Sequence, residues 1–208
     1  MVNNMRLYED VKKDVIKYAV EDFADHQIVI IGAPTKEYPD NPTIIKCSKP
    51  GTVIHSFTVV LASRVICVWG DIGDWIIYHN NTDPFKWVSG AIDSPSYLIG
   101  KIVAGEKEEF YPDEAIELLN RWLSDDCPAG ECPYERETVE SVYNQIETPP
   151  YELSEEKWVS AWIDEGDDDP PNCNYPTEGA MLLVEALKCL VRLIPKLDNV
   201  SEVPNVKD

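Results

Sequence analysis

The sequence predicts an α+β fold with an N-terminal helix, an antiparallel sheet of about four to five strands and a helical C-terminal half. Apolar residues at helical spacing open the chain, Val- and Ile-rich runs bounded by Pro, Gly, Asn and Asp follow, and longer amphipathic stretches fill the second half. With 208 residues, 44% of them hydrophobic, the chain has enough apolar surface to bury a core. We expect residues 1–105 to form the helix and sheet, and residues 106–208 to form an acidic helical half that packs on the sheet as one domain or stands apart.

The elements of the first half follow from its hydrophobic spacing. Residues 7–22 place Leu7, Val11 and Ala19 on one stripe, which predicts an amphipathic helix. The apolar residues are nearly continuous in the runs around residues 58–63 and 64–69, so we expect those central strands to be covered on both faces. The predicted strands cover residues 27–33, 43–47, 52–63, 64–70 and 74–80.

The segment VWGDIGDWIIYH, residues 68–79, reads as a hairpin. Gly70 and Gly73 permit positive φ, and Asp71 is expected to accept hydrogen bonds from neighbouring amides. A carboxylate-rich calcium loop needs EF-hand spacing, which is absent here. A phosphate-binding loop needs a following helix that carries Lys and Ser or Thr, whereas Trp75 continues as strand. The pattern therefore favours a structural turn.

The second half shows helical patterns. Residues 112–125 begin with Pro and two acidic residues, as first helical turns commonly do. Ser154 is expected to cap a helix in which Trp158 and Trp162 lie on one face, where they serve either the core or a contact surface. Further helices are expected at residues 135–147 and 177–197, and the last of these is apolar enough to pack onto the core.

Charge is the strongest compositional feature, with a formal net charge of −20. Residues 1–105 hold 12 acidic and 10 basic residues, whereas residues 106–208 hold 26 and 8. This asymmetry argues against direct nucleic-acid binding, because neutralising phosphates requires Lys and Arg. It favours a partner with a basic surface, and the alternative is an acidic coat that only maintains solubility.

The six cysteines include one spacing that is compatible with a metal site. Cys127 and Cys132 lie in a turn-rich loop, and Cys173 is a candidate third ligand of a structural zinc. One Cys pair supplies half of a tetrahedral shell, and the three histidines all lie in the other half of the chain. Two free thiols or a labile disulfide are the alternatives. No other cofactor is expected.

Catalytic patterns are scarce. Ser56 and His55 are adjacent on a predicted strand and so point to opposite faces, and no G-x-S-x-G motif occurs. His79 with Asp71 and Asp74 is the best candidate for a metal-dependent hydrolase. Because turn Asp and strand-end His are common without function, we expect no catalytic residue.

Three short motifs in the first half are Asp10-Val11-Lys12, the WGDIG segment from Trp69 to Gly73, and DPFKW from Asp83 to Trp87. Through these motifs, residues 8–119 resemble an uncharacterised family of phage and prophage proteins. The segment Ser96-Tyr97 with Lys101 matches the family's Y-W-x-x-K pattern, from which Leu98 departs because the family has Trp there. The resemblance implies a phage accessory protein made in a bacterial cytoplasm, and it implies no catalytic residues. Its other matching residues are Phe57 and Trp75 to Tyr78.

These observations lead to the hypothesis of a non-enzymatic inhibitor of a host defence or nucleic-acid-handling protein, with carboxylates at positions that phosphates would occupy. No membrane-spanning run or signal peptide is evident, and a dimer is compatible with the sequence. The alternatives are a ligand-sequestering protein, a small metal-dependent hydrolase, and a virion or self-assembling structural protein. The candidate contacts are Asp125, Asp126, Glu131, Asp164, Glu165, Asp167, Asp168 and Asp169, with Trp158, Trp162 and Tyr175 as a hydrophobic alternative.

Overall fold

The computed structural model divides the chain into two compact units. It describes residues 7–38, 40–125, 127–128, 130–146, 150–166 and 170–194. The sheet unit comprises Lys12–Lys107 and Pro176–Asp208, and the acidic unit comprises Met1–Val11 and Glu108–Tyr175. The acidic unit holds 22 acidic and 4 basic residues of the sequence, against 16 and 14 in the sheet unit. Nearly all of the net charge therefore belongs to one unit.

An antiparallel sheet of six strands, ordered as in the sequence, forms the centre of the sheet unit. The α+β class is confirmed, and the predicted count of four to five strands is one short. The missed strand has only three residues, too few to show an alternating pattern. The strands are β1 (Gln27–Gly32), β2 (Thr43–Ser48), β3 (Phe57–Ala62), β4 (Val65–Gly70), β5 (Trp75–Tyr78) and β6 (Ile102–Ala104).

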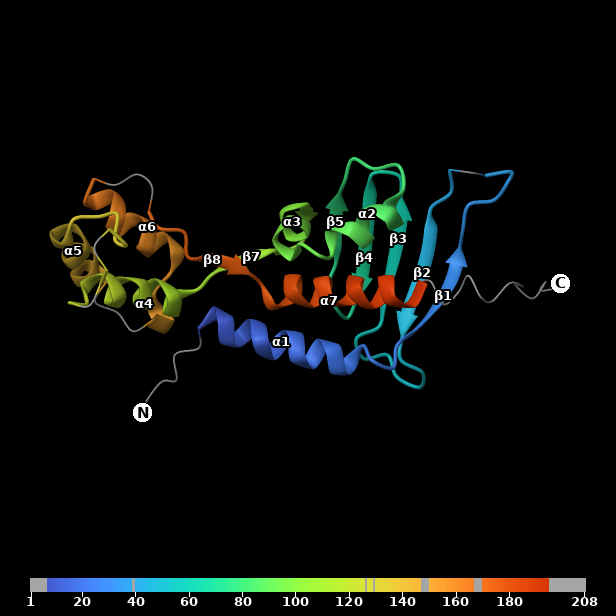
Figure 1. Cartoon of the computed structure of the whole chain (residues 1–208), viewed down its shortest axis with the longest axis horizontal. Helices are drawn as coiled ribbons and strands as arrows, with labels where there is room; N and C mark the ends of the chain where they lie inside the picture. The colour runs from blue at the N-terminus through green and yellow to red at the C-terminus, as the bar shows by residue number, and fades with distance from the viewer. Residues whose placement is uncertain are drawn as a thin grey trace. The chain divides into compact units, whose positions relative to one another are not determined.

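One face of this sheet is buried under helices. Figure 1 shows α7 (Glu178–Leu193) running across the strands, and α2 (Pro84–Ala91) and α3 (Pro95–Gly100) lie on the same face. The helix α1 (Tyr8–Asp22) begins in the acidic unit and contributes Ala19 to the core of the sheet unit. The prediction that the central strands are covered on both faces is wrong within the described residues, because their outward side chains are partly or fully exposed.

Helix α7 supplies much of this cover. Nine of its residues are buried, and the side chain of Thr177 caps its N-terminus by accepting from the Ala180 amide at 3.0 Å. The Thr177 hydroxyl also donates to the carbonyl of Glu106 at 2.7 Å. The observed division therefore differs from the expected boundary at residue 105, because the chain from Pro176 onward belongs to the sheet unit. A helix this apolar needs a large apolar surface to pack on, and the sheet offers it.

The acidic unit has its own helical core. Its elements are β7 (Glu108–Phe110), α4 (Pro112–Leu123), α5 (Arg136–Ile146), the 3-10 helix η1 (Pro150–Glu152), α6 (Glu155–Asp164) and β8 (Asn174–Pro176). Strands β7 and β8 pair with each other. The expected cap is confirmed, because the Ser154 side chain accepts from the Lys157 amide at 3.2 Å. The core includes Ala115, Leu119, Val142, Ile146, Trp158 and Trp162.

The segment from Gly70 to Asp74 is the hairpin turn that the sequence predicts. The amide of Gly73 donates to the carbonyl of Gly70 at 3.0 Å, and Ile72 is buried. The indole of Trp75 donates to the Ile72 carbonyl at 2.7 Å. The turn thus holds Trp75 in the core.

Replacing Gly70 with Ala is expected to lower the free energy of unfolding by about 2 kcal/mol or more. Gly70 has φ 136, and a Cβ there would collide with the Ser56 carbonyl oxygen. Gly90→Ala is the matched control, because Gly90 lies in α2 with nothing within 4 Å of the added Cβ, and we expect it to be neutral or stabilising by up to about 1 kcal/mol. Urea unfolding of both variants measures this, and equal stabilities would contradict the steric argument.

Candidate functional site

The exposed carboxylates of the acidic unit form the candidate site. The segment from residue 108 to 175 contains only three basic residues, namely Arg121, Arg136 and Lys157. These cannot neutralise the acidic side chains around them. The acids of this segment that the structure describes as exposed are Glu108, Glu109, Asp125, Glu131, Glu135, Glu137, Glu140, Glu152, Glu155, Glu156, Asp164 and Glu165.

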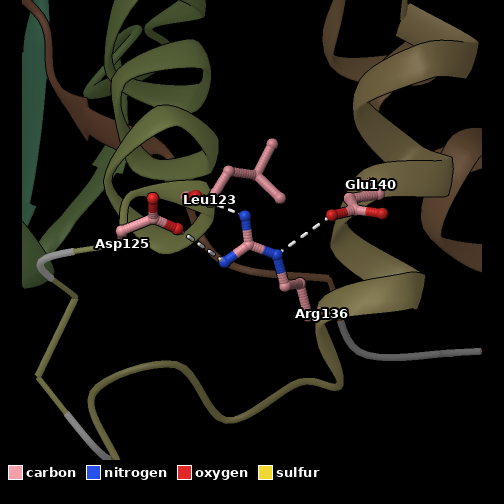
Figure 2. A network of polar contacts seen from close by, with 4 residues as sticks. All are labelled: Leu123, Asp125, Arg136 and Glu140. Atoms are coloured by element: carbon pink, nitrogen blue, oxygen red, sulfur yellow. Dashed lines mark hydrogen bonds and ion pairs between the residues drawn. The ribbon is translucent and has the colours of Figure 1, made fainter.

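Arg136 organises one edge of this surface (Figure 2). Its guanidinium donates to the carbonyl of Leu123 at 3.0 Å and to a carboxylate oxygen of Glu140 at 3.0 Å, and it lies 3.6 Å from Asp125. A cation at the last carbonyls of α4 also complements the dipole of that helix. Arg136 therefore connects the end of α4 to the first turn of α5, and two carboxylates are held beside it.

Other acids are oriented by polar neighbours. Glu131 pairs with Arg121 at 3.2 Å. Glu165, just after α6, accepts from the Ser141 hydroxyl at 2.6 Å and from the Gln145 amide at 2.5 Å, both on α5. These bonds fix the carboxylate of Glu165 on the protein surface.

A second group of acids is unengaged in the part of the chain that the structure describes. The side chains of Glu137, Glu152, Glu156 and Asp164 are exposed and make no hydrogen bond or ion pair there. Their charges are therefore free to meet cationic groups of another molecule.

The predicted acidic contact residues fall into two classes. Asp125, Glu131, Asp164 and Glu165 are exposed in the acidic unit. The other four predicted acids, Asp126, Asp167, Asp168 and Asp169, lie outside the described residues.

Trp158 and Trp162 belong to the core of the acidic unit. Their exposed fractions are 2% and 0%, and their rings meet edge to face at 5.7 Å. The indole of Trp158 donates to the Pro171 carbonyl at 3.1 Å. Their spacing of four is therefore a core pattern, and their assignment as partner-binding residues is corrected.

The predicted zinc site is not assembled in the described chain. Among the described residues, no three His, Cys, Asp or Glu side chains gather as metal ligands would. The Cys132 thiol donates to the carbonyl of Tyr134 at 3.3 Å, and the Cys127 thiol lies 3.9 Å from the carbonyl oxygen of Pro128. Burial, and secondarily Glu114, raises the pKa of Cys173 to about 11, so this side chain is a protonated core thiol.

The candidate hydrolase residues are separated by a strand. Asp71 and Asp74 precede β5, whereas His79 follows it, so Asp74 and His79 are about 16 Å apart along an extended chain. His79 is 2% exposed and stacks on Trp87 with ring centroids 4.9 Å apart. The grouping of these residues as a metal site is therefore corrected.

An aromatic hollow that the sequence analysis missed lies beside His79. Its volume is about 430 Å³. The Lys101 ammonium lies 5.2 Å from the centroid of the Tyr97 ring, and Trp87 lies 6.2 Å from Tyr97. Aromatic walls with amides and one cation suit a small planar ligand that turns an acceptor or anionic group toward Lys101. The lining residues are Tyr78, His79, Asn80, Asn81, Thr82, Trp87, Tyr97 and Lys101.

His79 is expected to make stability depend on pH. Burial lowers the pKa of His79, although backbone groups of Ala62 and Asn81 act in the opposite direction. Below the usual histidine pKa of about 6.5 the unfolded chain takes up the proton first, so stability falls as the pH drops from that value toward the folded pKa. Urea unfolding at pH 7.5 and 5.5 should show a smaller loss for His79→Phe than for the unchanged protein.

Tyr97→Phe serves as the control for that measurement, because it alters the same hollow without removing the imidazole. It should retain the pH dependence. An identical loss of stability in the unchanged protein and in His79→Phe would exclude His79 as its source.

Comparison with known proteins adds no functional assignment. No protein-family model matches the chain, and the comparisons with curated proteins and with solved structures each find no match. No helix among the described residues is long and apolar enough to cross a membrane.

Proposed function

We propose that the protein is a non-enzymatic binding protein whose acidic unit docks on a basic surface of another protein. The proposal rests on one observation: 22 acidic and 4 basic residues are collected in a compact unit with its own core. An acidic coat that only maintains solubility does not require such segregation, since charges spread over both units would serve equally well.

Both groups of carboxylates support this role. Those tied to Arg121, Arg136, Ser141 and Gln145 keep a fixed arrangement. Carboxylates that are already held in place lose little conformational entropy when a partner binds. The unengaged carboxylates attract a cationic partner toward the surface. Surfaces that bind nucleic acid carry Arg and Lys in phosphate-spaced arrays, so the favoured partner is a host protein that handles nucleic acid. A phage origin, expected from the resemblance of residues 8–119, is consistent with an inhibitor of host defence.

Neutralising the unengaged acids should weaken binding. The test variant combines Glu137→Gln, Glu152→Gln, Glu156→Gln and Asp164→Asn. A tagged full-length chain captures proteins from bacterial lysate, the retained basic protein is identified, and its Kd is measured at low and at high salt. We expect the variant to bind at least about tenfold more weakly, and salt to weaken the unchanged protein steeply.

The matched control carries Glu21→Gln, Glu37→Gln, Glu106→Gln and Asp93→Asn, which removes the same charge from exposed acids of the sheet unit. This control should bind like the unchanged protein, and duplex DNA should compete for the retained partner. Docking through the acidic unit would be refuted if binding were unchanged both at high salt and after the loss of all four test carboxylates. It would also be refuted if only the control variant lost binding.

A second candidate function is small-molecule binding in the hollow beside His79. The stacked His79 and Trp87 rings and the nearby Lys101 favour it, because they combine a flat apolar wall with a cation. Native mass spectrometry of protein purified from a bacterial host separates the two candidates. Added mass that disappears in Lys101→Met favours the hollow.

A further inference from the structure

The sheet unit has an apolar face that none of its own described elements covers. We call it the open face and define it by the outward side chains of β2 to β5. Trp69, Ile76 and Tyr78 are 43%, 40% and 45% exposed there, although large apolar side chains usually gain by burial. The remaining members are Ile44, Lys46, Thr58, Val60, Val65 and Cys67.

Strand register joins these side chains into continuous rows. In one row Ile44 lies beside Val60, Val60 beside Cys67, and Cys67 beside Ile76. A second row runs from Lys46 through Thr58 to Trp69, and a third joins Val65 to Tyr78. Because these rows cross adjacent strands, the apolar surface is contiguous and not a set of scattered exposed residues.

The near absence of charge restricts the occupant of the open face. Lys46 is the one charged side chain among its residues, in a chain with a net charge of −20. A basic or an acidic partner would gain few ion pairs on such a face. A second open face matches it, because apolar rows then meet apolar rows and no acidic side chain enters the contact.

Sheet geometry is compatible with this pairing. Two sheets stack about 10 Å apart with their strands inclined by about 30°, and a two-fold axis makes the contact self-complementary. With the axis between β3 and β4, at the middle of the open face, the two Lys46 side chains on β2 strands lie about 14 Å apart, since neighbouring strands are spaced by about 4.8 Å. Their repulsion is therefore weak.

We infer that two copies of this chain associate through their open faces. The four strands of the open face, of about five residues each, span on the order of 300 Å² of flat sheet per copy, which is below the size of stable interfaces and in the range of weak, transient contacts. The dimer is accordingly expected to be weak, with a Kd of ~1–100 µM. This inference does not depend on the function proposed for the acidic unit.

Sedimentation velocity of the full chain tests the inference. The mass should rise from 23.6 kDa toward twice that value over the micromolar range. Ile76→Lys should raise the Kd at least tenfold. Ile16→Lys is the matched control, because Ile16 is 37% exposed on α1, off the open face, and it should dimerise normally.

Cys67 supplies a readout that needs no variant. It lies within the open face, so its modification by a thiol reagent, mapped by peptide mass, should slow as the protein concentration rises. A monomer at all concentrations would overturn the inference, as would a dimer that Ile76→Lys leaves intact. Protection of Cys67 that is independent of concentration would show instead that the chain covers its own face. Because no partner protein is present, failure here leaves the acidic docking proposal standing.

Discussion

The sheet unit depends on the burial of one sheet face under α7. This helix is separated in sequence from the strands it covers by the whole segment from residue 108 to 175. Its buried residues, including Leu183 and Leu187, join the same core as Val59 and Ile77 of the central strands. The chain must therefore return to the sheet unit after the acidic unit. The segment Glu108–Tyr175 of the acidic unit is thus, in chain order, an insertion between β6 and α7.

This arrangement explains why charge and fold divide the chain at nearly the same places. A helix that is apolar over most of its surface needs a large apolar surface to pack on, and the sheet supplies it. The acidic unit instead buries a compact aromatic cluster around Trp162, while its charges stay in water. Concentrating like charges costs stability through repulsion, so a unit of this kind requires a compensating core or a compensating role. The core is present, and the binding function we propose supplies the role.

Local signals predicted much of the fold. The helix at residues 8–22, five of the six strands and the Ser154 cap follow from spacing and turn chemistry, which act over a few residues. The expected packing of the last helix onto the core is confirmed. Its assignment to the acidic half was wrong, because a break in charge composition near residue 105 carries no information on which elements pack together. The separation of Asp74 from His79 was also missed, since grouping them as one end of a hairpin ignored the length of β5 between them.

The two proposed surfaces differ in the force that acts on them. Docking by carboxylates is Coulombic, so added salt weakens it by shortening the Debye length, beyond which charges are screened, from its value of about 8 Å at physiological ionic strength. Association of the open faces is hydrophobic, and salts such as sulfate strengthen it by being excluded from apolar surface. A chain with both surfaces therefore responds to salt in opposite directions at its two units. The two surfaces lie in different units of the chain. Trp69, Ile76 and Tyr78 belong to the sheet unit, which is nearly neutral, whereas Glu137 and Asp164 belong to the acidic unit.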